Sequence, residues 1–238
     1  MSDKWEPISK EHKILVSKEH CFNTDTILLA NFSAPKKNYA CADFGSGCGT
    51  IAFLWEIRQD PKKIYAVELQ EKACEQVKQS INKNNFQKIE LINANINEYK
   101  KFFSHASLDL IACNPPYKAK GAGLKNSQDN LRIARHEDEL EIEQLAKAVA
   151  FCLKFGGKFC MCQRPERLTD CMNILRKNAL EPKILSLVQQ RKDKRPSLFL
   201  LECKKGAHSG LDILPTLFIE ENGVFSDEMI KIYGDYKN

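Results

Sequence analysis

The chain has 238 residues, of which 43% are hydrophobic, so it can bury a sizeable core and is not expected to be disordered. The 36 basic residues exceed the 31 acidic ones and leave a net charge of +5, which permits a nucleic-acid partner without requiring one. No apolar run approaches the ~20 residues of a membrane span, and the start lacks the pattern of a secretory signal, so we expect a cytoplasmic protein.

Short β-rich segments alternate with helical patterns along most of the chain. After an N-terminal hairpin and a short helix, the sequence predicts strands at 39–44, 63–69, 88–92, 108–113, 158–162, 184–188 and 198–203. The predicted helices span 50–58, 71–84, 139–154 and 166–178. This alternation predicts an α/β fold, with a mostly parallel seven-stranded sheet and helices on both faces. The last two strands have no helix between them, so they should form an antiparallel hairpin at one edge.

The domain organisation is predicted from what the chain lacks between its elements. No Ser/Gly-rich linker interrupts it, so we expect a single domain with an N-terminal extension (1–38), a core (39–205) and a packed C-terminal tail (206–238). The tail should pack through its apolar residues, which are Ile213, Leu214, Leu217, Phe218 and Ile219. In a sheet of this kind the ligand lies beyond the carboxyl ends of the parallel strands.

A glycine-rich turn follows the first core strand and opens the first core helix. It contains Gly45, Gly47 and Gly49, which let the backbone approach a ligand closely, and the helix N-terminus adds unpaired N–H donors. Glu68 ends the next strand, where a carboxylate can accept both hydroxyls of a ribose. A tight strand-to-helix turn without a ligand would have the same pattern.

Two details favour S-adenosylmethionine over a dinucleotide as the cofactor. The glycines follow the spacing G-x-G-x-G, whereas dinucleotide sites use G-x-G-x-x-G. Asp43 precedes the turn, where it would repel a pyrophosphate but suit the ammonium group of a methionine moiety. Asn95, after the third core strand, is placed to bind the cofactor adenine, although an ordinary polar loop residue would look the same.

The strongest signal is the segment that follows the fourth core strand. Its two prolines, Pro115 and Pro116, exclude helix and strand pairing, which holds the Asn114 side chain and the Pro115 carbonyl beside the predicted cofactor. These two acceptors can bind the N–H groups of a conjugated amine and localise its lone pair for methyl transfer. Tyr117 offers a ring on which a planar substrate can stack. We predict these four residues as catalytic, with Asn114 also contacting the cofactor.

Together these motifs resemble the class I, Rossmann-like amino-methyltransferases that use S-adenosylmethionine and carry an Asn-Pro-Pro-Tyr motif. Segments 23–29, 133–137, 164–168, 213–215 and 232–234 are similar to the bacterial enzymes that methylate N6 of the adenosine beside the anticodon of a valine tRNA. The resemblance implies this activity and cofactor contacts from Thr24 and Asp25. It also shows one departure, because Asn95 stands where the family usually has an aspartate.

Basic residues accompany the predicted active site. One group lies in the loop of the edge hairpin, which the topology places at the active-site end of the sheet, and the others follow the catalytic motif or the fifth strand. Cationic side chains in such positions can track RNA phosphates. We expect RNA contacts from Lys118, Lys120, Arg135, Arg164, Arg191, Lys192, Lys194 and Arg195.

The ten cysteines form no CxxC pair and have no histidine at zinc-ligand spacing, so we expect reduced core thiols and no metal. Cys160 and Cys162 alternate in an apolar run and should share one strand face.

Two alternatives to the tRNA enzyme stay open. A protein glutamine-N5-methyltransferase meets the same planar amide problem, but it commonly has an all-helical N-terminal domain that this sequence does not show. A non-catalytic RNA- or cofactor-binding protein is disfavoured because the catalytic motif is complete. We expect a monomer or a weak dimer.

Overall fold

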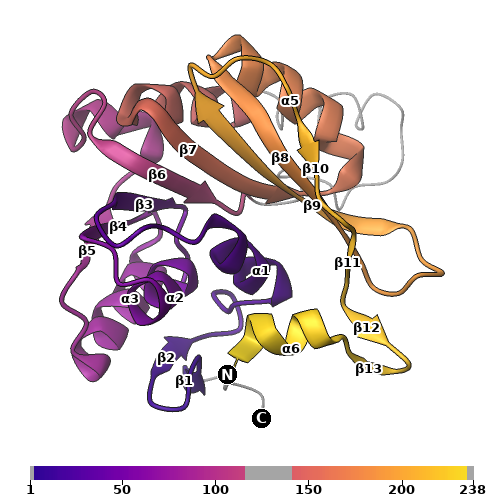
Figure 1. The fold of residues 1–238 in the computed structure, drawn as a ribbon. Helices are drawn as coiled ribbons and strands as arrows, with labels where there is room; N and C mark the ends of the chain where they lie inside the picture. The colour runs from indigo at the N-terminus through magenta and orange to yellow at the C-terminus, as the bar shows by residue number, and fades with distance from the viewer. Residues whose placement is uncertain (1–2, 116–140, 235–238) are drawn as a thin grey trace, which may run out of the picture.

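A central sheet with helices on both faces organises the computed structural model, which describes residues 3–115 and 141–234 (Figure 1). Its long strands are β3 (Ala40–Phe44), β4 (Lys63–Glu68), β5 (Ile89–Asn93), β6 (Leu108–Cys113), β7 (Leu153–Gln163), β8 (Leu180–Gln189) and β9 (Pro196–Lys205). Their order is β8-β9-β7-β6-β3-β4-β5. β9 runs antiparallel to both of its neighbours, and the other adjacent pairs of long strands are parallel. The predicted sheet and its antiparallel hairpin are therefore confirmed.

The sequence pattern predicts the hairpin at the edge of the sheet, but in the structure further strands lie outside it. Two short strands, β10 (Asp212–Ile213) and β11 (Leu217–Phe218), pair in parallel with β8 and extend the sheet to nine strands. Leu217 is buried, but Ile213 and Leu214 are 66% and 42% exposed, so the expected packing of these two residues is wrong. The tail is held to β8 by strand pairing through the backbone, and the side chains of an outermost strand can remain exposed to solvent.

The two ends of the described chain meet beside the sheet (Figure 1). The N-terminal hairpin of β1 (Lys4–Pro7) and β2 (Lys13–Val16) leads into α1 (Thr24–Ser33), as predicted. Beyond β11, the hairpin of β12 (Glu220–Glu221) and β13 (Val224–Phe225) leads into α6 (Asp227–Tyr233), which packs against α1.

Helices α2 (Thr50–Arg58) and α3 (Glu71–Asn84) have the bounds that the sequence predicted. The later helices differ more: α5 covers Leu168–Lys177 after a 3-10 turn, η2 (Pro165–Arg167), and a second 3-10 segment, η1 (Ile96–Lys101), follows β5. Residues 141–152 are helical, but β7 begins at Leu153, earlier than expected. The reason is that Leu153 pairs with Leu108 of β6, so sheet formation overrides the helical pattern there.

Two hydrophobic cores fill the spaces between the sheet and its helices. The core between the sheet and helices α1, α2 and α3 contains Leu28, Phe53 and Trp55. The core between the sheet and the helices α5 and 141–152 contains Val149 and Phe159. Nine of the ten cysteines are buried and all are free, as expected for core thiols, while Cys21 is exposed. Among the described residues, no helix combines the length and apolar character needed to cross a membrane.

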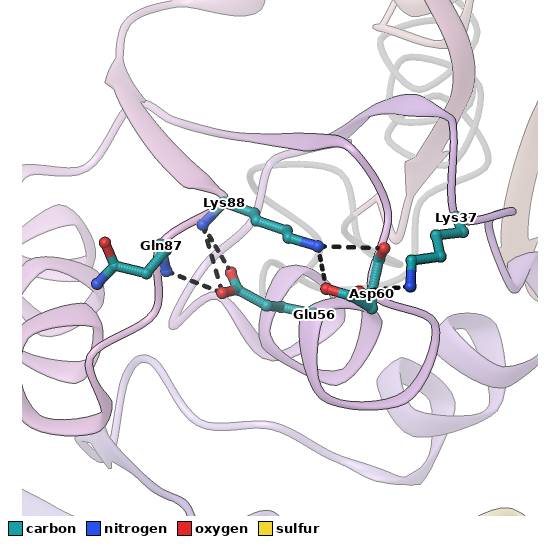
Figure 2. Close-up of polar contacts among 5 residues, drawn as sticks. All are labelled: Lys37, Glu56, Asp60, Gln87 and Lys88. Carbon is teal, nitrogen blue, oxygen red and sulfur yellow. Dashed lines mark hydrogen bonds and ion pairs between the residues drawn. The ribbon is translucent and has the colours of Figure 1, made fainter.

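The amino end of the sheet is closed by a polar cluster (Figure 2). Glu56 of α2 accepts hydrogen bonds from the backbone N–H groups of Gln87, at 2.8 Å, and Lys88. The Lys88 ammonium binds Asp60, whose carboxylate also lies 3.6 Å from the Lys37 ammonium. These contacts tie the end of α2 to the turn before β5. They lie at the opposite end of the sheet from the glycine turn.

Candidate active site

The carboxyl ends of β3, β4 and β6 bring three predicted site residues to one edge of the sheet. Asp43 of β3 is in register with Ala66 of β4 and Ala112 of β6. Because the three strands are parallel, Glu68 at the end of β4 and Asn114 just after β6 emerge on the same edge. The topology therefore brings these three residues together at the edge where the sequence predicts the site, and their role stays a prediction.

The glycine turn combines a packing requirement with open space. All three of its glycines have positive φ, at 74° for Gly45, 54° for Gly47 and 83° for Gly49. A Cβ atom on Gly49 would lie 2.6 Å from the ring of Phe53, so this glycine lets α2 pack closely. A Cβ atom on Gly45 or Gly47 would have no neighbour within 4 Å in the described part of the chain. The backbone there is open to a ligand.

Glu68 stabilises the glycine turn from below. Its Oε2 atom accepts a hydrogen bond from the Gly47 N–H at 2.8 Å, and Oε1 accepts one from the Gln70 N–H at 2.9 Å. Each carboxylate oxygen has further acceptor capacity, so these contacts orient the group without exhausting it. The next residue, Leu69, is 60% exposed and offers apolar surface beside Glu68. Sequence reasoning missed Leu69, since nothing in the local pattern separates it from an ordinary strand-terminal leucine.

Asp43 is a buried carboxyl group at the end of β3. It is 1% exposed, and neither carboxyl oxygen has a hydrogen-bond partner among the described residues. Burial raises the pKa of Asp43 to about 8, and the negative charge of Glu68 adds to the shift, whereas the nearby backbone N–H of Ala52 opposes it. The hydroxyl of Ser46 in the same turn is also buried, and no residue of the described chain forms a hydrogen bond with it. Unsatisfied buried groups are costly, so the turn fits a ligand that brings a cation and hydrogen-bonding groups.

The raised pKa of Asp43 predicts that the free energy of unfolding decreases as pH rises. Folded protein keeps the Asp43 proton up to about pH 8, whereas the unfolded chain loses it near pH 4. Between about pH 4 and pH 8, the free energy of unfolding should therefore decrease by about 1.4 kcal/mol per pH unit. The corresponding decrease in Tm is a few degrees per pH unit. In Tm measurements on cofactor-free protein from pH 6 to 8, Asp43→Asn should abolish this slope and the exposed-site control Asp212→Asn should retain it. Equal slopes for wild type and Asp43→Asn would contradict the assignment.

The side chain of Asn114 is held between two elements. Its Nδ2 atom donates to Thr26 Oγ1 of α1 at 3.2 Å, and its Oδ1 atom accepts from the Cys162 thiol of β7 at 3.1 Å. Cys162 is buried on the same strand face as Cys160, as predicted, but its contact with Asn114 was not foreseen. A buried cysteine in an apolar strand carries no sequence signal for such a role.

Three predicted cofactor contacts have other neighbours in this structure. Thr24 Oγ1 lies 3.1 Å from the Tyr233 hydroxyl of α6, and Asp25 is half-buried in the first turn of α1. Asn95 is exposed, and its Oδ1 atom accepts from the Asn97 N–H at 2.9 Å and caps η1. Cofactor binding by these residues stays a prediction.

The hairpin loop 190–195 lies at the active-site edge, as predicted. Phe199 of β9 pairs with Gln163 at the carboxyl end of β7, so the loop before β9 extends beyond that edge (Figure 1). The guanidinium of Arg164 donates to the Ser197 carbonyl at 3.0 Å and ties β7 to the base of the loop. The loop exposes four basic side chains against one acidic side chain, Asp193; the basic ones are Arg191, Lys192, Lys194 and Arg195.

The described part of the predicted catalytic motif ends at Pro115. Pro115 is half-buried at the described end of the segment after β6. The predictions for the next part of the motif and for the basic residues after it lie outside the described residues; they concern Pro116, Tyr117, Lys118, Lys120 and Arg135.

Comparison with known families agrees with this geometry. The sequence profile of the family described as "Methyltransferase small domain" matches residues 11–161, well over half of the chain. The chain belongs to this family. The part matched by the methyltransferase profile contains the glycine turn, Glu68 and Asn114, whereas loop 190–195 lies outside it.

Curated relatives of this methyltransferase-family chain carry a more specific name. A protein from Shewanella sp. (strain MR-4) named "tRNA1(Val) (adenine(37)-N6)-methyltransferase" is 25% identical over 224 residues, which cover 90% of both chains. A protein of the same name from Parabacteroides distasonis is 26% identical and covers 90% of this chain and 89% of its own. One from Bacteroides thetaiotaomicron is 31% identical over 138 residues, or 57% of this chain and 56% of its own.

Solved structures share the fold at low sequence identity. A predicted O-methyltransferase from Agrobacterium tumefaciens superposes with a TM-score of 0.71 at 17% identity, covering 88% of this chain and 95% of its own. TYW2 from M. jannaschii, solved in complex with AdoMet, gives a TM-score of 0.57 at 11% identity and covers 85% and 84% of the two chains. These likenesses establish the Rossmann-like methyltransferase fold.

Proposed function

We propose that this chain transfers a methyl group from S-adenosylmethionine to N6 of an adenosine in tRNA, beside the anticodon of a valine tRNA. The observation that carries the proposal is the fixed Asn114 amide, which emerges on the same sheet edge as the open glycine turn and the unpartnered Asp43. The shared name of the curated relatives supports the choice of tRNA as substrate.

The residues of the turn fit the cofactor. The Asp43 carboxyl lacks a partner that the methionine ammonium group would provide. Glu68 retains acceptor capacity for the ribose hydroxyls, and the exposed Leu69 side chain suits the face of the adenine ring. When bound, S-adenosylmethionine supplies an electrophilic methyl group on its sulfonium. Asn95, Thr24 and Asp25 are proposed as additional contacts on the strength of the resemblance.

The protein acts on the substrate amine through positioned acceptors. An adenine amino group is a poor nucleophile because its lone pair is delocalised into the ring. The Asn114 Oδ1 atom and the Pro115 carbonyl can accept its two N–H groups and favour a tetrahedral nitrogen, whose lone pair then points at the methyl group. Positioning and electrostatics carry this step. To reach Asn114 the adenine must leave its stack, which costs less in an anticodon loop than in a duplex.

The loop 190–195 would bind tRNA phosphates at the same edge of the sheet. With four basic residues and Asp193, its net charge is +3. The Arg191 guanidinium lies 3.2 Å from the Asp193 carboxylate, and Lys192 lies 3.8 Å from Glu221, so surrounding contacts hold the loop. Within this proposal the protein is a single cytoplasmic domain, active as a monomer or weak dimer.

Transfer of labelled methyl groups tests the function directly. Unmodified tRNA transcripts and a release-factor protein are incubated in parallel with the enzyme and labelled S-adenosylmethionine, followed by nucleoside and amino-acid analysis. Label in N6-methyladenosine of a valine tRNA is the expected result. Label in a glutamine of the protein would replace the proposal with the glutamine-N5 alternative. Cofactor binding without transfer to either substrate would favour the non-catalytic alternative.

A further inference from the structure

The side chain of Asn114 belongs to a chain of hydrogen bonds that begins at the cap of α1 and ends at Cys162. Asn23 Oδ1 accepts from the backbone N–H of Thr26 at 3.0 Å and from the Thr26 hydroxyl, also at 3.0 Å. Thr26 Oγ1 then accepts from Asn114 Nδ2 at 3.2 Å, and Asn114 Oδ1 accepts from the Cys162 thiol at 3.1 Å. The chain runs through four side chains on α1, the end of β6 and β7.

The direction of every bond in this chain follows from its first member. A backbone N–H can only donate, so Asn23 must turn its amide oxygen toward Thr26. The hydroxyl hydrogen of Thr26 is then used on that same oxygen, which leaves its Oγ1 atom as an acceptor. Asn114 must therefore turn its NH₂ group toward Thr26 and its oxygen toward β7. If the Asn114 amide were reversed, its oxygen would face Thr26 Oγ1 with no hydrogen between the two atoms.

Cys162 orients the Asn114 oxygen without greatly weakening it as a hydrogen-bond acceptor. A thiol is a weak donor, so its hydrogen bond to Oδ1 lowers the basicity of that oxygen only slightly. An amide oxygen can accept two hydrogen bonds, so the bond from the thiol does not by itself exclude one from a substrate N–H. Cys162 is fully buried, and its neighbour on the same face, Cys160, is equally buried two residues earlier. The two cysteines therefore form a matched pair for testing.

We propose that Thr26 and Cys162 are positioning residues that hold the Asn114 oxygen toward the substrate amine, with Asn23 setting the direction of the hydrogen bonds. This inference rests on the proposed catalytic role of Asn114. It assigns a task to Thr26 in the first turn of α1, which lies 88 residues from Asn114 in sequence. It also separates Cys162 from the other buried cysteines, which serve as core residues.

Kinetics of Thr26→Val test the proposal, because valine keeps the shape of threonine but removes the hydroxyl. We expect kcat to fall by about tenfold, since an acceptor is misoriented and not lost, while KM for tRNA stays within about twofold. Thr26→Ser should restore the rate. Cys162→Ala should lower kcat by a few fold, roughly the effect of one weak donor, and the matched control Cys160→Ala should not.

Double variants distinguish positioning from a general structural role. If Thr26 acts through Asn114, Thr26→Val will cause no further loss of rate in an Asn114→Ala background. A tenfold further loss in that background would overturn the proposal. An unchanged kcat in Thr26→Val alone would overturn it as well.

A readout without cofactor or substrate keeps this inference separate from the function itself. In ¹⁵N-labelled protein, the side-chain amide signals of Asn114 are those missing from Asn114→Ala. We expect Thr26→Val and Cys162→Ala to shift them, and Cys160→Ala to leave them in place. Unmoved signals in the first two variants would overturn the positioning role even if methyl transfer is observed. Shifted signals in a protein without activity would support the hydrogen-bond chain and refute the proposed function.

Discussion

Asn114→Ala is expected to lower the rate of methyl transfer by about 10²–10³-fold, the scale of losing one acceptor that acts in the transition state. The Asn114 oxygen is aimed by Thr26 and Cys162, and alanine removes it altogether. The buried Asp43 and the Glu68 carboxylate, which carry most of the proposed cofactor contacts, are left intact. The affinity for S-adenosylmethionine should therefore change little, as measured by calorimetry beside single-turnover kinetics.

Asn97→Ala provides the control for this substitution. Asn97 is an exposed asparagine whose side chain contacts Gln144, so its loss tests the effect of removing an amide at a surface position. We expect wild-type turnover from this variant. An Asn114→Ala enzyme that keeps more than about a tenth of the wild-type rate would refute the catalytic role, because such a loss is smaller than one transition-state acceptor provides.

Neutralising the four basic residues of loop 190–195 should weaken tRNA binding by roughly 10–100-fold and reduce the slope of log Kd against log salt by about 3. Each phosphate contact releases condensed counterions, so fewer contacts mean both lower affinity and weaker salt dependence. The variant replaces Arg191, Lys192, Lys194 and Arg195 with glutamine. Binding titrations with a valine tRNA at several salt concentrations measure both quantities.

A control with the same change in charge is available at the opposite end of the sheet. Lys154, Arg176, Lys177 and Lys204 are exposed and lie near the amino ends of β7 and β8 or the carboxyl end of β9. Replacing these four with glutamine should leave the salt slope unchanged. If both variants lose affinity equally, the effect is one of net charge, and the tRNA does not bind specifically at the loop.

Local patterns predicted most of the elements. α2 matches its predicted bounds because Gly49 precedes it and Pro61 follows it, and α3 matches because its apolar periodicity is contained in its own sequence. β7 was predicted too short, since its early start depends on pairing between Leu153 and Leu108. The tail strands β10 and β11 were missed for the same reason, because each has two residues and exists through its pairing with β8.

For the active site, the sequence identified residues but not their surroundings. The glycine turn, Glu68 and Asn114 were recognisable from residue types and spacing, and the parallel sheet brings them to one edge. The exposure of Leu69, the isolation of the Asp43 carboxyl and the bond from Cys162 to Asn114 had no local signal. Each depends on neighbours that are distant in sequence.

The sequence by itself determined the α/β class, the succession of strands and helices, and the residue types that can bind a cofactor and an amine, because these follow from short-range periodicity and chemistry. Tertiary structure alone decided which way Asn114 faces and which carboxyl lacks a partner. The physical reason is that hydrogen-bond direction and desolvation are properties of contacts, and those contacts join α1, β6 and β7 only after the sheet has formed.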